Sequence, residues 1–139
     1  MEKSTCINCL KKFSYRKQCS TGKYCSNKCQ QTYQSKKLLK EWLDGHWDGT
    51  KKGMCLSSII RNYLLEEVDH KCSKCGWCQI NPTTGKSPLE IDHIDGNSEN
   101  NRPENLRVLC PNCHSLTPTY KALNKGKGSK VRLKHHKLI

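Results

Sequence analysis

The chain is polar over most of its length, and its apolar residues gather in a few short runs. In the first of these stretches the apolar residues recur at the spacing of one helix face. This spacing predicts a helix that begins near Asn27 and runs through residues 30–43. Ser26 stands at the position of a helix N-cap, and Gly45 ends the pattern. The apolar edge of this helix is expected to consist of Tyr33, Leu39, Trp42 and Leu43.

A second helical pattern follows residues 49–53, which read as a turn or linker. Ser57 or Ser58 can cap a helix that extends from Ile59 to Asp69. Because this helix has an apolar stripe, we expect it to pack against the residues that follow it in the chain. The stripe consists of Ile59, Ile60, Tyr63, Leu64 and Val68.

Residues 89–93 alternate between apolar and polar side chains, which predicts a short strand. Residues 95–104 read as a turn and a polar loop, in which Asn97, Asn100 and Asn101 are interpreted as turn residues. Residues 106–109 are a second apolar run, suited to a returning strand, and a helix is expected from about residue 112. The pattern therefore predicts a β-hairpin followed by a helix that crosses it, in a small α+β fold.

These runs cannot build a large core, since 34% of the residues are hydrophobic and 6% are aromatic. Folds of this size usually need metal ions or disulfides for stability. The chain has eleven cysteines, an odd number, and most of them lie in closely spaced pairs. No export signal is recognised at the N-terminus. Together these features favour zinc sites over disulfides. We expect two zinc ions, one held by Cys6, Cys9, Cys25 and Cys29 and the other by Cys72, Cys75, Cys110 and Cys113.

The remaining three cysteines leave alternatives open. Cys19 could compete as a ligand in the first site, although its spacing fits less well, and Cys78 could substitute for Cys75 in the second. Cys55 is interpreted as a small apolar filler. Four thiolates leave no coordination position for water, so the second site should be structural.

The formal net charge of +13 is concentrated at the two ends of the chain. Residues 1–40 have ten basic residues and one acidic residue, and residues 115–139 have seven basic residues and no acidic residue. Residues 72–114 have four basic and five acidic residues. This distribution favours basic arms that bind DNA, although a basic surface kept for solubility is a simpler alternative. The expected DNA contacts are Lys11, Lys12, Arg16, Lys17, Lys121, Lys125 and Arg132.

Candidate catalytic residues lie within and just after the second cysteine site. Asp92 and His114 are suited to hold one divalent ion such as Mg²⁺ or Mn²⁺, and His93 is suited to act as a general base because imidazole titrates near neutral pH. Asn105 is expected to hydrogen-bond the backbone of the loop after His93 and to keep that base oriented. In the simpler alternatives, Asp92 is a turn residue and His114 replaces a thiolate at the zinc.

Three short patterns in this stretch resemble the signature of the HNH endonuclease family: Asp92-His93, Asn105-Leu106, and Cys-Pro-Asn-Cys-His at residues 110–114. The sequence of residues 92–106 is most similar to that of the phage-type homing members of the family. The resemblance covers about residues 72–120 and implies a ββα-metal nuclease fold, one catalytic divalent ion, and hydrolysis of DNA phosphodiester bonds. A treble-clef-like zinc finger before the nuclease domain is a looser resemblance.

The expected organisation is a zinc finger and helix at residues 1–48, a linker and amphipathic helix at 49–71, a nuclease domain at 72–124, and a basic flexible tail at 125–139. No run is long and apolar enough for a membrane span, and the cytoplasm, that of a bacterial host if the gene belongs to a phage, is the expected location. Two other functions stay open: a zinc-dependent DNA-binding protein without catalysis, and a structure-specific or packaging-associated nuclease. A monomer and a weak dimer are both compatible with the sequence.

Overall fold

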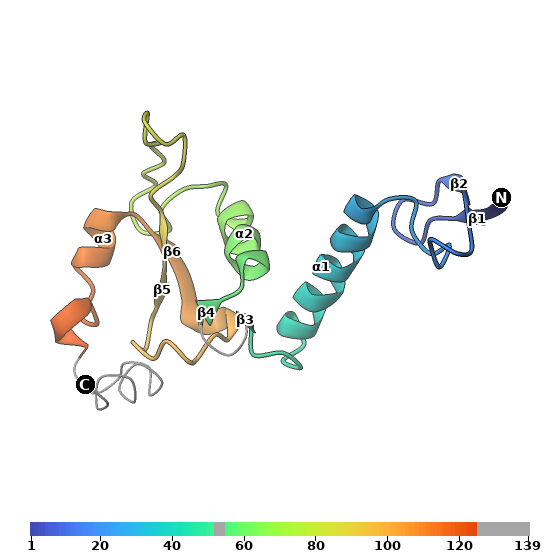
Figure 1. Cartoon of the computed structure of the whole chain (residues 1–139). Coiled ribbons are helices and arrows are strands. Elements are labelled where there is room, and N and C mark those ends of the chain that lie inside the picture. The colour runs from blue at the N-terminus through green and yellow to red at the C-terminus, as the bar shows by residue number, and fades with distance from the viewer. Residues whose placement is uncertain (52–54, 125–139) are drawn as a thin grey trace, which may run out of the picture. The chain divides into compact units, whose positions relative to one another are not determined.

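The structure is a computed structural model, and it describes residues 1–51 and 55–124. These residues form a small α+β protein with short strands and helices (Figure 1). The chain divides into two compact units, one from Met1 to Asp44 and one that begins at Gly45. Each unit has its own antiparallel strands, its own helix and its own group of four cysteines.

The first unit consists of a small hairpin followed by a long helix. β1 (Glu2–Thr5) and β2 (Lys12–Tyr15) pair in antiparallel fashion. α1 (Asn27–Leu43) has the bounds that the sequence pattern predicts. Ser26 is its N-cap, and the Ser26 side chain accepts a hydrogen bond of 3.2 Å from the backbone N–H of Cys29. This bond satisfies one of the N–H groups that a helix leaves unpaired at its start.

The apolar edge expected on α1 is only partly buried. Trp42 is buried, but Tyr33 is 38% exposed and Leu43 is 47% exposed. The rest of the first unit is a hairpin of two four-residue strands with its connecting loops, and it does not cover a helix of 17 residues along its whole length. Periodicity therefore identified the helix correctly and overestimated how much of it is covered.

The second unit begins with a short ladder and a helix. β3 (Thr50–Lys51) pairs with β4 (Cys55–Leu56), so the segment expected as a turn or linker contributes a strand. α2 (Ser58–Glu67) follows, and the Ser57 side chain caps it by accepting a hydrogen bond of 3.3 Å from the backbone N–H of Ile59. Of the two serines predicted as caps, Ser57 is the one used.

α2 ends two residues before Asp69, the predicted end of the helix, and it buries one side chain that the predicted stripe did not include. Asp69 and His70 adopt left-handed backbone conformations, with φ of 50° and 52°, which a right-handed helix cannot continue through. Ile60 and Leu65 are the buried residues of α2, and Leu64 and Val68 are partly buried. The predicted stripe omitted Leu65, because one residue of error in phase turns the assigned face by about 100°.

The predicted hairpin and helix are present in the second unit. β5 (Glu90–His93) and β6 (Leu106–Leu109) are antiparallel and are joined by a loop that ends in the short helix η1 (Pro103–Asn105). α3 (Pro111–Ser115) follows β6 directly and contacts both strands. A last short helix, η2, covers Lys121–Leu123.

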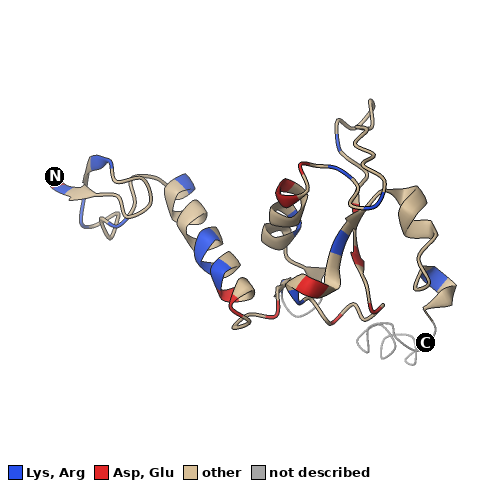
Figure 2. Ribbon diagram, turned by 180° about the vertical axis from the view of Figure 1, so that it is seen from behind, with Lys and Arg blue, Asp and Glu red and all other residues tan. Residues whose placement is uncertain are grey.

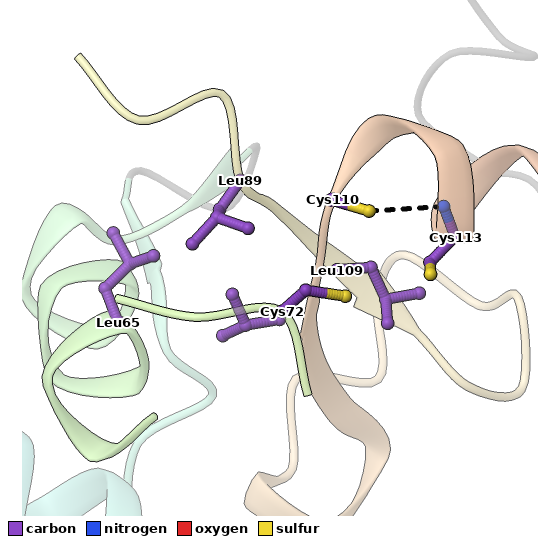
Figure 3. Close-up of a cluster of buried hydrophobic side chains, with 7 residues drawn as sticks. Leu65, Cys72, Leu89, Leu109, Cys110 and Cys113 are labelled. Carbon is purple, nitrogen blue, oxygen red and sulfur yellow. Dashed lines mark hydrogen bonds between the residues drawn. The ribbon is translucent and has the colours of Figure 1, made fainter. Parts of the chain in front are cut away.

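The core of the second unit mixes aliphatic side chains with cysteines (Figure 3). Leu89, Val108 and Leu109 are each 1% exposed, and they pack beside the cysteines that precede β5 and follow β6. Leu65 attaches α2 to this cluster, so the helix packs on the following residues as predicted. The cluster consists of Leu65, Cys72, Leu89, Val108, Leu109, Cys110 and Cys113.

Arg61 ties α2 to the start of the hairpin. Its guanidinium donates a hydrogen bond of 2.7 Å to the backbone carbonyl of Leu89, immediately before β5. This contact fixes the strand that carries the candidate catalytic residues against α2. Within the described residues, no helix has the length and apolar character needed to cross a membrane.

Candidate active site and metal centres

Four cysteines of the first unit converge beside the N-terminus of α1. Cys6 and Cys9 lie in the turn between β1 and β2, and Cys25 and Cys29 lie at the beginning of α1. Their sulfur atoms all lie within 4.8 Å of one another. Cys25 Sγ is 3.6 Å from Cys9 Sγ and 3.5 Å from Cys29 Sγ. This group could hold one metal ion.

Four cysteines of the second unit form a matching group. Cys72 and Cys75 precede the hairpin, Cys110 is the N-cap of α3, and Cys113 lies within α3. The four sulfur atoms lie within 4.8 Å of one another, and Cys75 Sγ is 3.7 Å from Cys110 Sγ. Because two ligands come from each end of the segment, a metal ion bound here would fix both ends of the candidate catalytic stretch.

The other cysteines lie outside both groups. Cys19 and Cys78 are exposed, and the second group contains Cys75 rather than Cys78. Cys55 is also exposed, so its interpretation as an apolar filler is wrong. It stands on β4, a strand of two residues.

Each group contains a buried cysteine whose pKa lies well below that of a free thiol. Burial opposes ionisation of Cys6 and of Cys72, but hydrogen bonds from backbone N–H groups outweigh it and lower the pKa of each thiol to about 6. The sulfur atoms around Cys25 and Cys113 raise the pKa of those two thiols to about 12. In the first group the pKa of Cys29 is lowered as well, chiefly by a hydrogen bond with the Asn8 side chain. Metal binding would displace the protons that remain on the other thiols.

Three charged side chains of the second unit's hairpin share one face, called the charged face below, on which Leu109 also lies. Side chains alternate along a strand, and residues paired across two strands point to the same side. Ile91 is paired with Val108, and both contribute to the core. Asp92 is paired with Arg107, and Glu90 lies two residues before Asp92, so these three charged residues share the opposite face.

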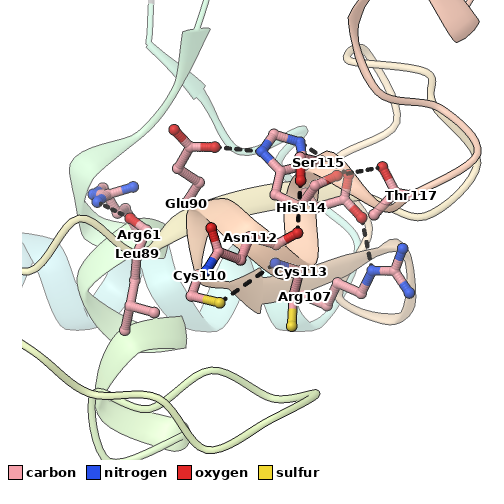
Figure 4. Close-up of polar contacts among 11 residues, drawn as sticks. Arg61, Leu89, Glu90, Arg107, Cys110, Asn112, Cys113, His114, Ser115 and Thr117 are labelled. Carbon is pink, nitrogen blue, oxygen red and sulfur yellow. Dashed lines mark hydrogen bonds and ion pairs between the residues drawn. The ribbon is translucent and has the colours of Figure 1, made fainter.

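Asp92 and His114 meet on the charged face of the hairpin. Asp92 is 5% exposed, and its Oδ1 atom lies 3.5 Å from Nε2 of His114, which projects from α3. The other ring nitrogen of His114, Nδ1, contacts the carboxylate of Glu90 (Figure 4). The Nε of Arg107 donates to Oδ2 of Asp92 at 2.7 Å. The carboxylate oxygens of Asp92 therefore face two different partners.

His93 ends β5 and is held from the following loop. Its Nε2 lies 2.8 Å from Oδ1 of Asn101, which is 4% exposed. The sequence pattern suggested that Asn101 is a turn residue, and that interpretation misses this contact. The side-chain oxygen can only accept, so the ring nitrogen donates and His93 carries its proton on Nε2 when neutral. The second ring nitrogen, Nδ1, is then the basic one.

Asn105 closes the loop that follows His93. Its side-chain oxygen accepts a hydrogen bond of 3.0 Å from the backbone N–H of Asp95. Its amide group donates to Oδ1 of Asp95 at 2.9 Å and to the backbone carbonyl of Asn100 at 2.7 Å. The backbone hydrogen bond predicted for Asn105 is therefore present, in a side chain that is 8% exposed.

Asp95 is itself stabilised in its ionised form. Burial acts to raise its pKa, but the hydrogen bonds from Asn100, from the backbone of Asn97 and from Asn105, together with the nearby charge of His93, bring the pKa of this carboxyl below its usual value. The loop after the candidate base is thus organised around a carboxylate.

The basic residues expected to bind DNA have different surroundings. Figure 2 shows lysines and arginines along the hairpin and α1 of the first unit, where Lys11, Lys12 and Arg16 are exposed. Lys17 is engaged with Glu2 at 2.8 Å. Lys121 lies over the ring of Tyr120, 4.9 Å from its centroid. Two further candidates, Lys125 and Arg132, lie outside the described residues.

Three residues with partners in the candidate site were missed by sequence reasoning. Glu90 and Arg107 had a detectable signal, because Glu90 stands one strand period before Asp92 and Arg107 lies in the returning strand. Their pairing depends on the register of the hairpin, which the sequence leaves undetermined. Asn101 had no separate signal, since it lies in a loop with other asparagines.

Comparison with known proteins finds similarity to one protein family in part of the chain. Residues 83–115 match the profile of the HNH endonuclease family. The H-N-H endonuclease F-TflIV of Escherichia phage T5 is 45% identical over 71 residues, covering 49% of this chain and 30% of the relative. The Zorya protein ZorE of Escherichia coli is 26% identical over 129 residues, covering 85% of this chain and 33% of the relative. No solved structure matches the chain.

Only part of each relative is matched. This chain spans about a third of the length of each. The match to the family profile lies on the segment that contains β5, η1, β6 and α3, which also contains the pair formed by Asp92 and His114.

Proposed function

We propose that the chain is an HNH endonuclease, which needs a metal ion and hydrolyses phosphodiester bonds in DNA. The match of residues 83–115 to the profile of that family supports the proposal. The observation that carries this proposal is the approach of Asp92 Oδ1 to His114 Nε2, at 3.5 Å. His93, which follows Asp92 in the chain, has a defined hydrogen-bond partner in Asn101. A protein that only bound DNA would have no need for this arrangement.

Asp92 and His114 are suited to one divalent ion. Oxygen and nitrogen donors bind such ions at about 2.0–2.2 Å, so two bonds to one ion span at most about 4.3 Å, and a separation of 3.5 Å is compatible with a shared ion. The donor types suit Mg²⁺ or Mn²⁺, whereas the two cysteine groups suit zinc. A bound divalent ion would supply positive charge at the scissile phosphate and at the leaving oxygen.

His93 is the proposed general base. With its Nε2 donating to Asn101, the lone pair on Nδ1 is available to accept a proton from the attacking water. Asn105 supports this geometry indirectly, because it holds the backbone at Asp95, two residues after the base. We assign Asn105 an orienting role rather than a place among the ligands of the ion.

The wider architecture that we propose follows from the same residues. The order of β5, β6 and α3 supports a ββα-metal fold stapled by a structural zinc ion, and the cysteine group beside α1 supports a treble-clef-like finger with a second zinc ion. We propose the finger and helix at residues 1–48, the linker and helix at 49–71, the nuclease domain at 72–124 and a basic tail at 125–139.

DNA is the proposed partner because of charge. The chain has a formal charge of +13, and the exposed lysines and arginine of the first unit are suited to phosphate contacts. The similarity to a phage endonuclease supports activity in the cytoplasm of a bacterial host. Phosphate contacts of this kind bind without reading sequence.

Conversion of supercoiled plasmid to nicked and linear forms tests the proposal. Purified wild-type protein is incubated with Mg²⁺ or Mn²⁺, with and without excess chelator, beside His93→Ala and the matched variant His70→Ala. Wild type and His70→Ala are expected to cleave only with the ion, and His93→Ala to bind the plasmid without cleaving it. Equal cleavage by His93→Ala would contradict the assigned base, and binding without cleavage by all three proteins would favour a DNA-binding function.

A further inference from the structure

We infer that Glu90 is a positioning residue of the proposed metal site, which holds the ring of His114 so that Nε2 of that ring faces the ion. The inference rests on the proposed function, because it concerns the same site. It adds a residue that lies outside the patterns by which the family resemblance was drawn, and it assigns different roles to the two carboxylates of β5.

The strand geometry brings Glu90 to the site. Glu90 and Asp92 are separated by one period of β5 and therefore project from the same face. α3 contacts β5, and His114 projects from α3 toward that face. The Glu90 carboxylate contacts Nδ1 of His114 (Figure 4). Nε2 of the same ring faces Asp92. The two carboxylates thus address opposite nitrogens of one ring.

This division fixes the chemistry of the ring. A carboxylate at Nδ1 favours the form of imidazole that carries its proton on that nitrogen, and the lone pair of Nε2 is then directed away from Glu90. Histidines that bind metal ions usually donate their other N–H to such a partner, which orients the ring and increases the basicity of the ligand. Loss of the partner typically weakens metal binding by about 10- to 100-fold.

A second contact restricts the same ring. The Tyr120 ring meets the His114 ring edge-on, with centroids 5.2 Å apart and an angle of 80° between the planes. The tyrosine limits where the imidazole can lie, and the carboxylate decides which of its nitrogens faces Asp92. The side chain of His114 is 23% exposed and that of Glu90 is 52% exposed, so this contact lies at the protein surface.

Binding of Mn²⁺ to the full chain, measured by calorimetry without DNA and with the cysteine groups first loaded with zinc, tests this role. Glu90→Gln keeps the shape of the side chain and removes its charge, and Glu104→Gln is the matched control because Glu104 is exposed and stands on η1. We expect the Kd for Mn²⁺ to rise by about tenfold or more in Glu90→Gln and to stay unchanged in Glu104→Gln. An unchanged Kd in Glu90→Gln overturns the inference.

Nitrogen chemical shifts of the His114 ring, in protein saturated with the diamagnetic ion Mg²⁺, provide the second readout. The wild-type ring is expected to bind the ion through Nε2 with its proton on Nδ1, and the Glu90→Gln ring to show a mixture of the two tautomers. If Glu90 were instead a direct ligand, affinity would fall while the ring form stayed the same, which contradicts the positioning role. If wild type binds no Mn²⁺, the proposed metal site fails, and the inference falls with it.

Discussion

Arg107 donates a hydrogen bond from Nε to Oδ2 of Asp92, at 2.7 Å, and the two residues are direct partners across the hairpin. Asp92 is 5% exposed, so its charge is largely shielded from water and needs a partner inside the protein. Because Arg107 occupies Oδ2, Asp92 presents Oδ1 to His114 and to the proposed ion. The register of two short strands thereby decides how a buried carboxylate is shared.

Replacement of Arg107 by methionine is expected to destabilise the protein without a divalent ion by about 1–3 kcal/mol, because the Asp92 carboxylate loses its charged partner. The Arg107 side chain is 34% exposed, so water can offset part of the loss. Added Mn²⁺ should restore stability, since the ion replaces the lost positive charge. Chemical denaturation with and without Mn²⁺ measures both effects.

Arg102→Met is the matched control for this change, because Arg102 is exposed and precedes η1. We expect it to alter the free energy of unfolding by less than about 0.5 kcal/mol and to leave the response to Mn²⁺ unchanged. Equal destabilisation by the two substitutions would show that the pairing with Asp92 contributes nothing specific.

The second cysteine group is expected to be essential for the fold around the site. Cys110→Ser should lower the zinc content from two ions per chain to one and unfold the hairpin, since structural zinc can contribute on the order of 10 kcal/mol. Cys78→Ser is the control, because Cys78 is exposed and lies outside the group. Elemental analysis with near-ultraviolet circular dichroism reports both results, and a stable Cys110→Ser protein that still holds two zinc ions would contradict the assignment.

Asn105→Ala should loosen the loop that follows the candidate base. The substitution removes three hydrogen bonds from a side chain that is 8% exposed, with an expected cost of about 1–3 kcal/mol. Cleavage should slow as well, because the backbone at Asp95 is no longer held. Asn112→Ala, at an exposed position of α3, provides the comparison in denaturation and plasmid assays. Wild-type stability in Asn105→Ala would be inconsistent with the orienting role.

Gly96 has a position in the same loop that another residue cannot take without strain. Its φ is +75°, and a Cβ atom there would lie 2.4 Å from Oδ1 of Asn124 and 2.8 Å from Cγ2 of Thr119. Asn124 also donates a hydrogen bond of 2.7 Å to the Gly96 carbonyl. Gly96→Ala should therefore cost the roughly 1–2 kcal/mol of a left-handed alanine and, in addition, the displacement of Asn124.

Gly85→Ala separates these two contributions. Gly85 has a similar φ of +63°, and no atom of the described residues lies within 4 Å of the position that a Cβ atom would take there, so the substitution carries only the conformational cost. Thermal unfolding of both variants should show the larger loss for Gly96→Ala. Equal losses would mean that the contact between Gly96 and Asn124 has no energetic role.

The sequence predicted elements whose signals are local. Ser26 and Ser57 are N-caps as expected, and residues 106–109 form the returning strand, because helix caps and short apolar runs are encoded in neighbouring residues. The cysteine groups could also be predicted, since each of the two pairs in a group has its own short spacing. The end of α2 could not, because the left-handed backbone at Asp69 and His70 has no such signal.

The partners of the candidate catalytic residues depend on contacts between distant segments. Glu90 reaches a histidine 24 residues later, and Asp92 an arginine 15 residues later. These pairs follow from the register of β5 with β6 and from the way α3 lies on the hairpin. Sequence spacing could indicate that Asp92 and His114 act together, and it could not indicate which side chains hold them in place.

The most direct test of the whole account is the single-turnover rate of plasmid nicking as a function of Mn²⁺ concentration, for wild type, Asp92→Asn and His93→Ala. We expect Asp92→Asn to require at least about tenfold more Mn²⁺ for half-maximal rate, because the ion loses a charged ligand. His93→Ala should keep the half-maximal concentration of wild type and lose about 100-fold or more of the maximal rate, because only the base is removed. The same shift in Mn²⁺ requirement for both variants, or full rates in both, would contradict the assignment of one residue to the ion and its neighbour to the water.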